Sequence, residues 1–554
     1  MDSTAPVSPR LLLTALILGA VPALAATIAA PELLQRWDLP ITAGVLVGAL
    51  LLARRRSAER VPEFPFAFGL AVVIALVVPT SLHLSQPVPP TNDERAYLYQ
   101  AELFAEGKLS EALQLNELVD FTLRRRQVHE DQAQDLRYAK YPPGTSLWLT
   151  PGAWIGWPAL MAVSSALCSV LLARSLARQY GLPHPGTLAL LLALSPFFVL
   201  VQSGFQSEIA TLPAALLAWW ALLKVREGAS RYAVLVGLAC GLVFLARPLT
   251  GVVAALACGV GLLQLGGGAA ARVRAIVAAT LGGLPVLALM LAYQAAQTGE
   301  ALLSPYHAYA QAFGPWEDAS LAPDQRVPID VYGNGDLLAG IGRQAARWSV
   351  GLGMLGAAAL GFLGLWRLRA RDGGAAFVFA VGLPLAYSLH WYPGHWAYLG
   401  PLYGYESLAL LLIGFVAMAA AAPPAWGRNL VLALAAWGAI ATVPRFGLIQ
   451  EQVQLRSAPE RVAATLPDDS VLLLPFVAVP SMQEFGMKHW TPSRHPAAER
   501  VAIIRELPRA DHMLRALDAL GLGGRPVYRL SPRTDAQAGE PDYEALPAPD
   551  LSGS

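Results

Sequence analysis

Residues 65–84 read PFAFGLAVVIALVVPTSLHL, and a few residues later the segment 91–97 reads TNDERAY. The first stretch is an apolar run long enough to cross a bilayer, which takes about 17–25 residues of helix. The second begins the first long polar stretch of a mostly apolar chain, with the acid pair Asp93 and Glu94 near its start. Together they predict a membrane-spanning protein that places carboxylates at the membrane surface.

The composition also indicates a membrane protein. The chain has 554 residues, of which 55% are hydrophobic and 14% charged, against about 25% charged in soluble domains. A net charge of +1 gives no general attraction to nucleic acid, so no nucleic-acid partner is predicted. Cys168, Cys240 and Cys258 all lie inside apolar runs, without the spacing of a disulfide framework or metal site.

Apolar runs recur along the chain and predict an all-α polytopic membrane protein with about thirteen transmembrane helices. The first run contains ALAA at 23–26, which is similar to a signal-peptide cleavage site, but the many later spans favour an uncleaved helix. The predicted spans are 10–30, 40–53, 65–84, 146–173, 186–202, 208–224, 232–247, 249–266, 275–293, 347–366, 375–391, 400–421 and 428–444.

Basic residues predict the orientation. The short loops on one side carry about fifteen Lys and Arg and about three acids, which makes that side and the N-terminus cytoplasmic in a bacterial inner membrane. The loops 86–145 and 294–346 and the C-terminal region then face outward. The basic residues of the cytoplasmic side are Arg54, Arg55, Arg56, Arg60, Arg174, Arg178, Lys224, Arg226, Arg231, Arg272, Arg274, Arg367, Arg369 and Arg371.

Three regions are predicted. Residues 1–444 form the transmembrane domain, 445–535 a small α/β domain on the outer face, and 536–554 a disordered tail. Within the α/β domain, 471–479 and 526–530 are predicted strands and 511–520 a helix. The first outer loop is predicted to be partly helical, because Thr91 with Glu94 forms a capping-box signature and Gly107 is suited to end a helix.

Asp93 and Glu94 admit two roles. Glu94 completes the capping box on Thr91, and an acid in a first helical turn is stabilised by the macrodipole by roughly 0.3–1 kcal/mol. A carboxylate at the water–lipid boundary is also suited to take a proton from an acceptor hydroxyl or amine as a sugar leaves a lipid phosphate. The roles can coexist, with Asp93 as the predicted catalytic base and Glu94 in a second acidic site for the acceptor.

Four basic residues are candidates for binding the donor phosphate. Lys140, in the segment KYPPG at 140–144, either snorkels to the headgroups or neutralises a leaving phosphate. Arg247 lies between two closely spaced apolar runs, where it either ends a hairpin or grips a lipid phosphate. Arg343 and Arg347 share one helical face, either as interfacial anchors or as an extension of the phosphate site.

Two further carboxylates, Glu208 and Glu406, lie at membrane boundaries and extend the predicted second acidic site. Glu208 falls between two apolar runs, where an acid is costly unless it is hydrated or paired. It is either hydrated in a short outer loop or lines the cleft of Asp93, holding the acceptor or a divalent cation. Glu406 ends the densest aromatic stretch, 390–406, whose rings suit either an interfacial belt or stacking on sugars.

Several function classes lack their signals. The sequence has no P-loop and no glycine-rich nucleotide-binding fingerprint after a strand, so a cytoplasmic nucleotide-sugar donor is not predicted. No acid lies in the middle of a span in a way that marks an ion pathway. His390 and His395 lack a recognisable third zinc ligand, and the sequence leaves the need for a divalent cation open.

These motifs resemble those of the multi-spanning C-type glycosyltransferases, and more narrowly the bacterial relatives of the protein O-mannosyltransferases and the lipid A aminoarabinose transferases. The acid pair at 93–94 with the residues that follow it is the most specific match. Segment 140–144 is similar to that family's Lys-Pro-Pro segment, and GPLY at 400–403 with Glu406 is similar to its Gly-Pro-Arg-Tyr…Glu motif. A C-terminal outer domain ending in RPVY at 525–528 also fits.

The resemblance implies an inverting transfer of sugar from a polyprenyl-phosphate donor, with Asp93 as the base and Lys140 on the donor phosphate. The chain departs from the family pattern at two positions. Ala139 stands where some relatives carry an acid, and Leu402 replaces the arginine of the late motif. The second carboxylate's role then passes to Glu208, and one phosphate contact passes to Arg247 or Arg343.

The sequence is therefore interpreted as an integral membrane glycosyltransferase with its active site at the outer leaflet. The site is expected between the first outer loop, the 294–346 loop and the C-terminal domain, and the acceptor is a protein, a glycan or a lipid. One alternative is a transporter or flippase for lipid-linked sugars, which needs broken helices and a charged midplane site. Another is a ligase of O-antigen type, which only the 294–346 loop supports.

Overall fold

The computed structural model describes residues 7–12, 14, 63–85, 89–113, 127–131, 133–313, 357–388, 395–396, 400–475, 492–507, 509–532 and 543–548. The chain forms two compact units. The first, called the helical unit, comprises Met1–His83, Pro142–Ala292 and Pro328–Gly447. The second, called the mixed unit, comprises Leu84–Tyr141, Tyr293–Val327 and Leu448–Ser554.

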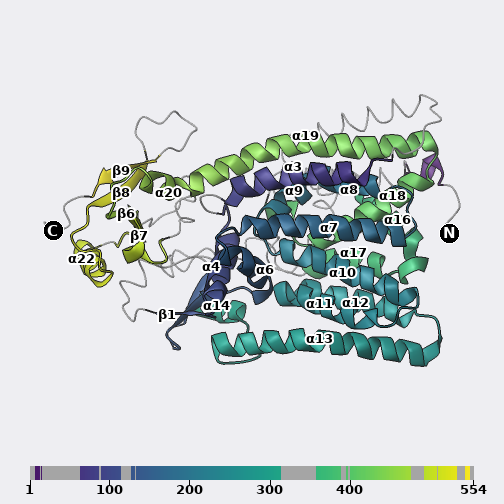
Figure 1. Cartoon of the computed structure of the whole chain (residues 1–554), viewed down its shortest axis with the longest axis horizontal. Coiled ribbons are helices and arrows are strands. Elements are labelled where there is room, and N and C mark those ends of the chain that lie inside the picture. The colour runs from purple at the N-terminus through teal and green to yellow at the C-terminus, as the bar shows by residue number, and fades with distance from the viewer. Residues whose placement is uncertain are drawn as a thin grey trace. The chain divides into compact units, whose positions relative to one another are not determined.

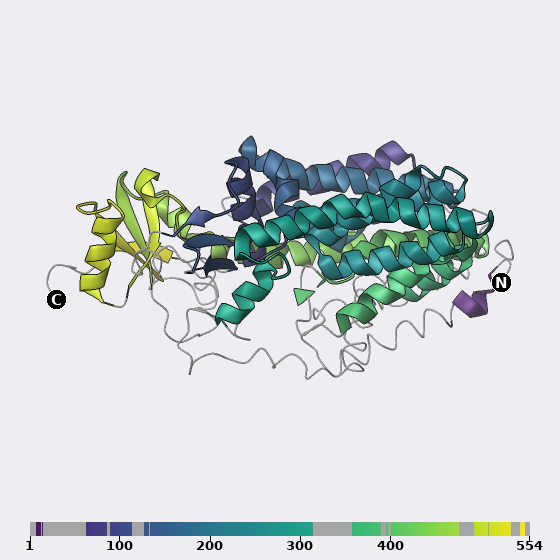
Figure 2. The ribbon, with the colours of Figure 1, turned by 90° about the horizontal axis from the view of Figure 1, so that it is seen from below.

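The helical unit is built from apolar helices whose axes run side by side in both views (Figure 1, Figure 2). Among the spans, α10 is central, with 83% of its apolar window buried, whereas α13 is peripheral, with 22% buried. The helices of this unit, some of which continue into the mixed unit, are α3 (Phe66–Ser85), α6 (Pro143–Trp154), α7 (Ala159–Gln179), α8 (Pro185–Leu194), α9 (Pro196–Ser203), α10 (Glu208–Arg226), α11 (Tyr232–Ala246), α12 (Pro248–Leu263), α13 (Gly268–Thr298), α16 (Ala357–Asp372), α17 (Ala375–Ser388), η4 (Tyr405–Ser407), α18 (Leu408–Ala421) and α19 (Pro424–Arg456).

The predicted count of thirteen spans is not confirmed. Within the described residues, α3, α7, α10, α13 and α19 are long and apolar enough to cross a membrane, and α8 with α9 would make a sixth span. Helices α11, α12 and α17, and the stretch Tyr405–Ala421, are apolar but shorter. The predicted span 40–53 and most of 10–30 lie outside the described residues. The predicted fold class, a mostly helical polytopic membrane protein, is therefore confirmed.

Two predicted spans are broken in the structure. The span predicted at 146–173 is divided between α6 and α7, because Gly156 adopts a left-handed φ of 71° and Pro158 follows. The span predicted at 186–202 is α8 and α9, which meet at an angle of 69°. The break falls at Ser195, whose hydroxyl accepts a hydrogen bond from the Phe198 amide and whose successor is a proline.

The mixed unit combines short helices with two sheets. The three-stranded antiparallel sheet has the order β1-β3-β2 and packs against α4, with Ala96, Tyr99 and Leu103 in their shared core. The elements are α4 (Asn92–Ala105), β1 (Glu111–Ala112), β2 (Val128–Asp131), β3 (Leu136–Ala139) and α14 (Pro305–Phe313), with α20 (Ala458–Ala463), β6 (Ser470–Leu474), η5 (Pro496–Ala498), β7 (Val501–Arg505), α22 (Ala510–Ala519), β8 (Val527–Pro532) and β9 (Tyr543–Pro547). Strands β4 (His395–Trp396) and β5 (Gly400–Pro401) form a small separate pair in the helical unit.

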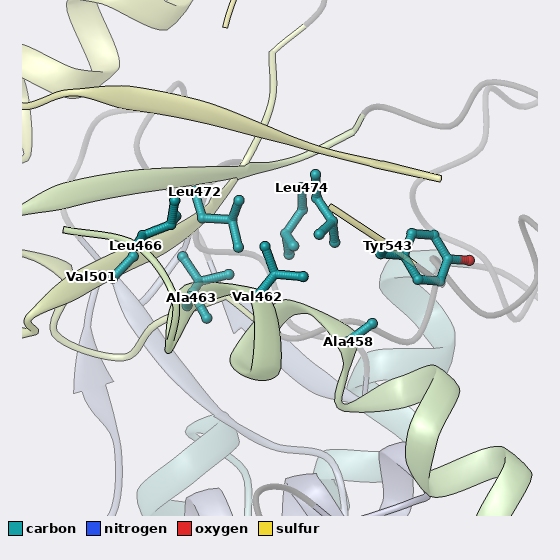
Figure 3. Close-up of a cluster of buried hydrophobic side chains, with 10 residues drawn as sticks. Ala458, Val462, Ala463, Leu466, Leu472, Leu474, Val501 and Tyr543 are labelled. Carbon is teal, nitrogen blue, oxygen red and sulfur yellow. The ribbon is translucent and has the colours of Figure 1, made fainter. Parts of the chain in front are cut away.

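The C-terminal part of the mixed unit is the predicted α/β fold. Its sheet has the order β7-β6-β8-β9, with β6 parallel to both neighbours and β9 antiparallel to β8. Leu472 and Leu474 of β6 pack on α20, whose Ala458 and Val462 complete one core (Figure 3). The predicted helix at 511–520 corresponds to α22, and the predicted strands at 471–479 and 526–530 overlap β6 and β8.

One of the two predicted boundaries differs from the structure. The division expected between residues 444 and 445 lies close to the division between the two units, at Gly447 and Leu448, and both fall inside α19, which continues to Arg456. The tail expected to be disordered from 536 includes β9, Tyr543–Pro547. Its polar composition gives no strand signal, but pairing with the edge of β8 and burial of Tyr543 supply the interactions that composition cannot show.

Close helix packing in the helical unit depends on glycine. A Cβ added at Gly364 of α16 would overlap the Gly414 carbonyl group of α18, whereas nothing lies within 4 Å of one added at Gly259 of α12. We predict that Gly364→Ala lowers the free energy of unfolding by about 1–3 kcal/mol, because backbone cannot move aside as a side chain can. Gly259→Ala should leave it unchanged or raise it by up to about 1 kcal/mol. Thermal unfolding of the two purified variants in detergent tests the difference, and equal melting temperatures would contradict it.

Candidate functional site

The acid pair lies in the first turn of α4, where the two carboxylates have different surroundings. Thr91 is the N-cap, and the Glu94 amide donates to its Oγ1 at 3.2 Å. In return Glu94 Oε2 accepts hydrogen bonds from the Thr91 amide at 3.0 Å and from Thr91 Oγ1 at 2.8 Å. The predicted capping box is therefore confirmed, and the Glu94 carboxylate is buried within it.

Asp93 is more exposed than Glu94 and faces different partners. Its side chain is partly accessible, and its carboxylate lies near the Tyr141 hydroxyl. Burial, followed by the nearby Asp93 carboxylate, raises the pKa of Tyr141 well above its usual range, so Tyr141 remains a proton donor. The Tyr97 and Tyr141 rings lie 4.7 Å apart between centroids, which places an aromatic surface beside the carboxylate.

Lys140 lies in a cage of tyrosine rings. Its Nζ is 4.7 Å from the ring centroids of Tyr306 and Tyr309, and 5.3 Å from that of Tyr141. The rings of Tyr306 and Tyr309 come from α14, and Lys140 follows directly after β3. Cation–π attraction to three rings holds a buried ammonium in one place. The cage therefore places a positive charge next to Tyr141, whose hydroxyl lies near Asp93.

His129 borders this cage but adds no charge to it at neutral pH. Its ring is 6.2 Å from that of Tyr309 and 5.3 Å from that of Tyr138. Burial lowers the pKa of His129 below its usual value, although Asp131 acts in the opposite direction. Lys140 is thus the cation that the cage holds at pH 7.

A second constellation is buried in the helical unit, where Arg247 joins Glu208 and Glu406. Arg247 Nη1 lies 2.6 Å from Glu208 Oε1 and 3.2 Å from Glu406 Oε1, and it also donates to the Leu402 carbonyl oxygen at 3.1 Å. The side chains of Glu208, Glu406 and Arg247 are 2%, 0% and 7% exposed, so the pairing takes place away from water. Buried charges at such distances are stable only as a paired set.

Neutral groups complete this cluster. Thr211 Oγ1 donates to Glu406 Oε1 at 2.6 Å, and Ser207 Oγ donates to Glu208 Oε2 at 3.2 Å. The guanidinium carbon of Arg247 lies 5.1 Å from the Tyr403 ring centroid and 5.5 Å from that of Tyr387. Glu406 Oε2 is buried and has no hydrogen-bond partner among the described residues. The cluster therefore contains two carboxylates and one guanidinium, and Glu406 Oε2 can still accept a hydrogen bond.

The cluster lies at the end of the helical unit opposite to the basic residues. Glu208 begins α10, whereas Arg226 ends it and donates to the carbonyl oxygens of Arg371, Gly261 and Gln264. The Tyr180 hydroxyl, just after α7, donates to Asp372 at 2.7 Å. The arginine-rich ends of α7, α10 and α16 are thus gathered at one end of the bundle.

The structure places the predicted site residues in two separate groups. Asp93, Glu94 and Lys140 lie in the mixed unit, while Glu208, Arg247 and Glu406 meet in the helical unit. Arg247, a candidate for holding the donor phosphate, pairs with two carboxylates in the structure. Arg343, Arg347 and His390 lie outside the described residues. Within the described residues, no group of three or more His, Cys, Asp or Glu side chains is arranged to hold a metal ion.

Sequence reasoning missed several residues of both constellations. Thr211 and Tyr387 lie in largely apolar helices, and nothing in their spacing connects them to Glu406 or Arg247. Tyr309 lies three residues after Tyr306 on α14, so the two share a helical face. That spacing was the available signal for an aromatic surface in the 294–346 loop.

Comparison with known proteins gives only distant likenesses, all of them to solved structures. No protein-family model matches the chain, and no curated protein matches it. Among solved structures, it is similar to the crystal structure of ArnT from Cupriavidus metallidurans bound to undecaprenyl phosphate, over 88% of this chain and 99% of that one. The identity is 13% and the TM-score 0.46.

This likeness agrees with the resemblance drawn from the sequence. A likeness this distant carries neither an activity nor a residue's role to the present chain. The roles proposed below rest on the chain's own residues.

We predict that Arg247→Met lowers the free energy of unfolding by about 3–5 kcal/mol, because it leaves two buried carboxylates without their cation. Adding Glu208→Gln and Glu406→Gln to that variant should recover part of the loss, since the charges are then removed together. Arg231→Met, at the exposed start of α11, is the matched control and should change stability by no more than about 0.5 kcal/mol. Thermal unfolding in detergent measures all three. An Arg247→Met variant as stable as the control would show that the cluster is not ionised.

Proposed function

We propose that the chain is a membrane glycosyltransferase that moves a sugar from a polyprenyl-phosphate donor to an acceptor at the outer leaflet of the bacterial inner membrane. The observation that carries the proposal is the arrangement in the mixed unit. A partly exposed carboxylate, a tyrosine hydroxyl near it and a caged ammonium are contributed by Asp93, Tyr141 and Lys140. This set provides a proton acceptor and a phosphate-binding cation in one place.

Asp93 is proposed as the general base. As the bond from the acceptor oxygen or nitrogen to the anomeric carbon forms, the bond from that carbon to the phosphate oxygen breaks. The acceptor proton passes to Asp93, and the bonding electrons leave with the polyprenyl phosphate. The Tyr141 hydroxyl orients the carboxylate, and the Tyr97 and Tyr141 rings offer a surface on which a sugar can lie.

Lys140 is proposed to stabilise the departing phosphate. Negative charge grows on the phosphate as the sugar leaves, and a positioned ammonium in a partly dry site lowers the energy of that state more than it does in water. The tyrosine cage fixes the ammonium beforehand, so little reorganisation is needed during the reaction. Arg343 and Arg347 remain candidates for further phosphate contacts.

The buried Arg247 cluster is proposed to have two roles. It stabilises the helical unit, and its carboxylates take part in binding. Glu208 and Glu406 are proposed to take part in holding the acceptor or the sugar, since Glu406 keeps one oxygen able to accept a hydrogen bond. The cluster lies at the end of the bundle away from the gathered arginines. If those arginines mark the cytoplasmic side, the cluster faces the outer leaflet.

A transporter or flippase of lipid-linked sugars is the second candidate. The bend of 69° between α8 and α9 and the buried charges that follow it at Glu208 are the kind of features that transporters use. A flippase moves its lipid without breaking the bond to the sugar. Asp93 and its proton-accepting geometry would then have no chemical task, which is why we favour the transferase.

We predict that Asp93→Asn lowers the rate of transfer by roughly 10²–10⁴-fold, because the amide cannot take the acceptor proton. The measurement is the release of polyprenyl phosphate from a synthetic polyprenyl-phosphate sugar by purified full-length protein, with an envelope fraction as the acceptor source. Asp135→Asn is the matched control, since Asp135 is exposed in the hairpin turn at φ 55°, a conformation that asparagine also tolerates. Full activity of Asp93→Asn with the fold intact would reject the assigned base. Lipid translocation without release of polyprenyl phosphate would favour the flippase.

We predict that Lys140→Met lowers kcat by about 10²-fold, the loss typical of removing one group that stabilises transition-state charge. Lys140→Arg should restore little of it, because three rings that enclose a compact ammonium leave less room for a planar guanidinium. Kinetics in detergent at varied donor concentration separate the effect of each variant on kcat from its effect on KM for the donor. A Lys140→Met variant with unchanged kcat and unchanged KM for the donor would remove Lys140 from the site.

A further inference from the structure

Both ends of α4, the helix that carries Asp93, are bound by arginines from the C-terminal segment of the mixed unit. Arg456 lies at the end of α19 and contacts the turn that precedes α4. Arg494, just before η5, contacts the C-terminal end of α4 and β1. The sequence separation exceeds three hundred residues in each case, so neither contact arises from local chain geometry.

The contact at the N-terminal end is reciprocal. The fully buried Arg456 donates through Nη1 to the carbonyl oxygen of Pro90, next to the N-cap. In the opposite direction, Arg95 of α4 donates through Nη2 to the Arg456 carbonyl oxygen at 3.2 Å and through Nε to the Pro89 carbonyl oxygen at 2.8 Å. The Arg456 carbonyl belongs to the last turn of α19, where carbonyls have no partner within the helix. Arg456 thus donates to a backbone oxygen just before α4, and Arg95 of α4 donates to a backbone oxygen at the end of α19.

The contact at the C-terminal end is an ion-pair network. Arg494 Nη1 and Nη2 bind the two oxygens of Glu106 at 2.7 and 3.1 Å, a bidentate pair, and Nε binds Glu111 Oε1 at 2.7 Å. The Tyr99 hydroxyl donates to the other oxygen of Glu111 at 2.8 Å, and its ring lies 5.6 Å from the guanidinium carbon. Arg494 is 11% exposed and Glu111 19%, so solvent screens this pair less than a surface pair, whereas Glu106 is 36% exposed.

We propose that the C-terminal segment is a clamp that positions the catalytic turn, with Arg456 and Arg494 as positioning residues for Asp93. Asp93 lies between the two contacts, two residues before Arg95 and six before Tyr99 on the same short helix. A helix of fourteen residues is only marginally stable by itself in water. Fixing both ends removes the movements that would carry the first turn away from its reacting geometry. The C-terminal α/β part then acts in the reaction through α4, without touching the substrates.

The structural claim is tested by hydrogen exchange of the full-length protein in detergent, for Arg456→Met and Arg494→Met separately. Peptides covering 92–105 should exchange faster in both variants, because their helix opens more readily without the clamp. Peptides covering β6 and β7 should be unchanged, which shows that the sheet remains folded. Arg515→Met, at an exposed arginine of α22, is the control. Unchanged exchange of α4 in either variant overturns the two-ended clamp.

The functional claim rests on the proposed base, so it is tested by kinetics beside Asp93→Asn. Each clamp variant should lower kcat by roughly 10–100-fold with KM for the donor little changed, since displacing a reacting group by about 1 Å can cost that much. Arg494→Lys, which keeps the charge but not the bidentate fork, should fall between Arg494→Met and the unmodified protein. Clamp variants with unchanged kcat overturn the positioning role. If Asp93→Asn retains full activity, the proposed base fails, while the exchange experiment still decides the clamp.

Discussion

A guanidinium group taken out of water must find acceptors for its N–H groups, and both units of this chain are organised around that requirement. In the helical unit, Arg247 brings together the start of α10, the junction of α11 and α12, and the turn before α18. In the mixed unit, Arg456 and Arg494 bind the two ends of α4. Arginine suits this use because its planar fork donates in several fixed directions and stays charged when buried. Each group therefore fixes segments that the sequence places far apart.

Features that depend on neighbouring residues were the ones that the sequence predicted well. The capping box at Thr91 and Glu94, the glycine that follows α4 and the apolar run of β6 all depend on residues within a few positions of each other. The Arg247 cluster joins residues 39 and 159 positions apart. Their residue types are visible in the sequence, but their meeting depends on how helices pack, which a single sequence does not encode in any periodic pattern.

The errors in the predicted spans have a related cause. Hydropathy averages over a window, so Gly156 and Ser195 disappear among their apolar neighbours even though each coincides with a break in a helix. Hydropathy falls inside α19 although the helix continues to Arg456, so the predicted boundary and the division between the two units both lie within that helix. Strand β9 is the opposite case, since it gains its order from the edge of β8 rather than from its own composition. Backbone geometry and strand pairing decide these points, and neither is a property of residue composition.

The order of the two acids explains how one turn can serve the fold and the chemistry together. A capping box requires the longer glutamate or glutamine side chain at the third helical position, because it must reach back to the N-cap amide. Glu94 occupies that position and is buried by the task. Asp93, one residue earlier, projects about 100° away around the helix, with a shorter side chain that meets Tyr141 instead. Exchanging the two residues would place the shorter acid where reach is needed. Stability of the turn and availability of the base therefore depend on this order and not merely on the presence of two carboxylates.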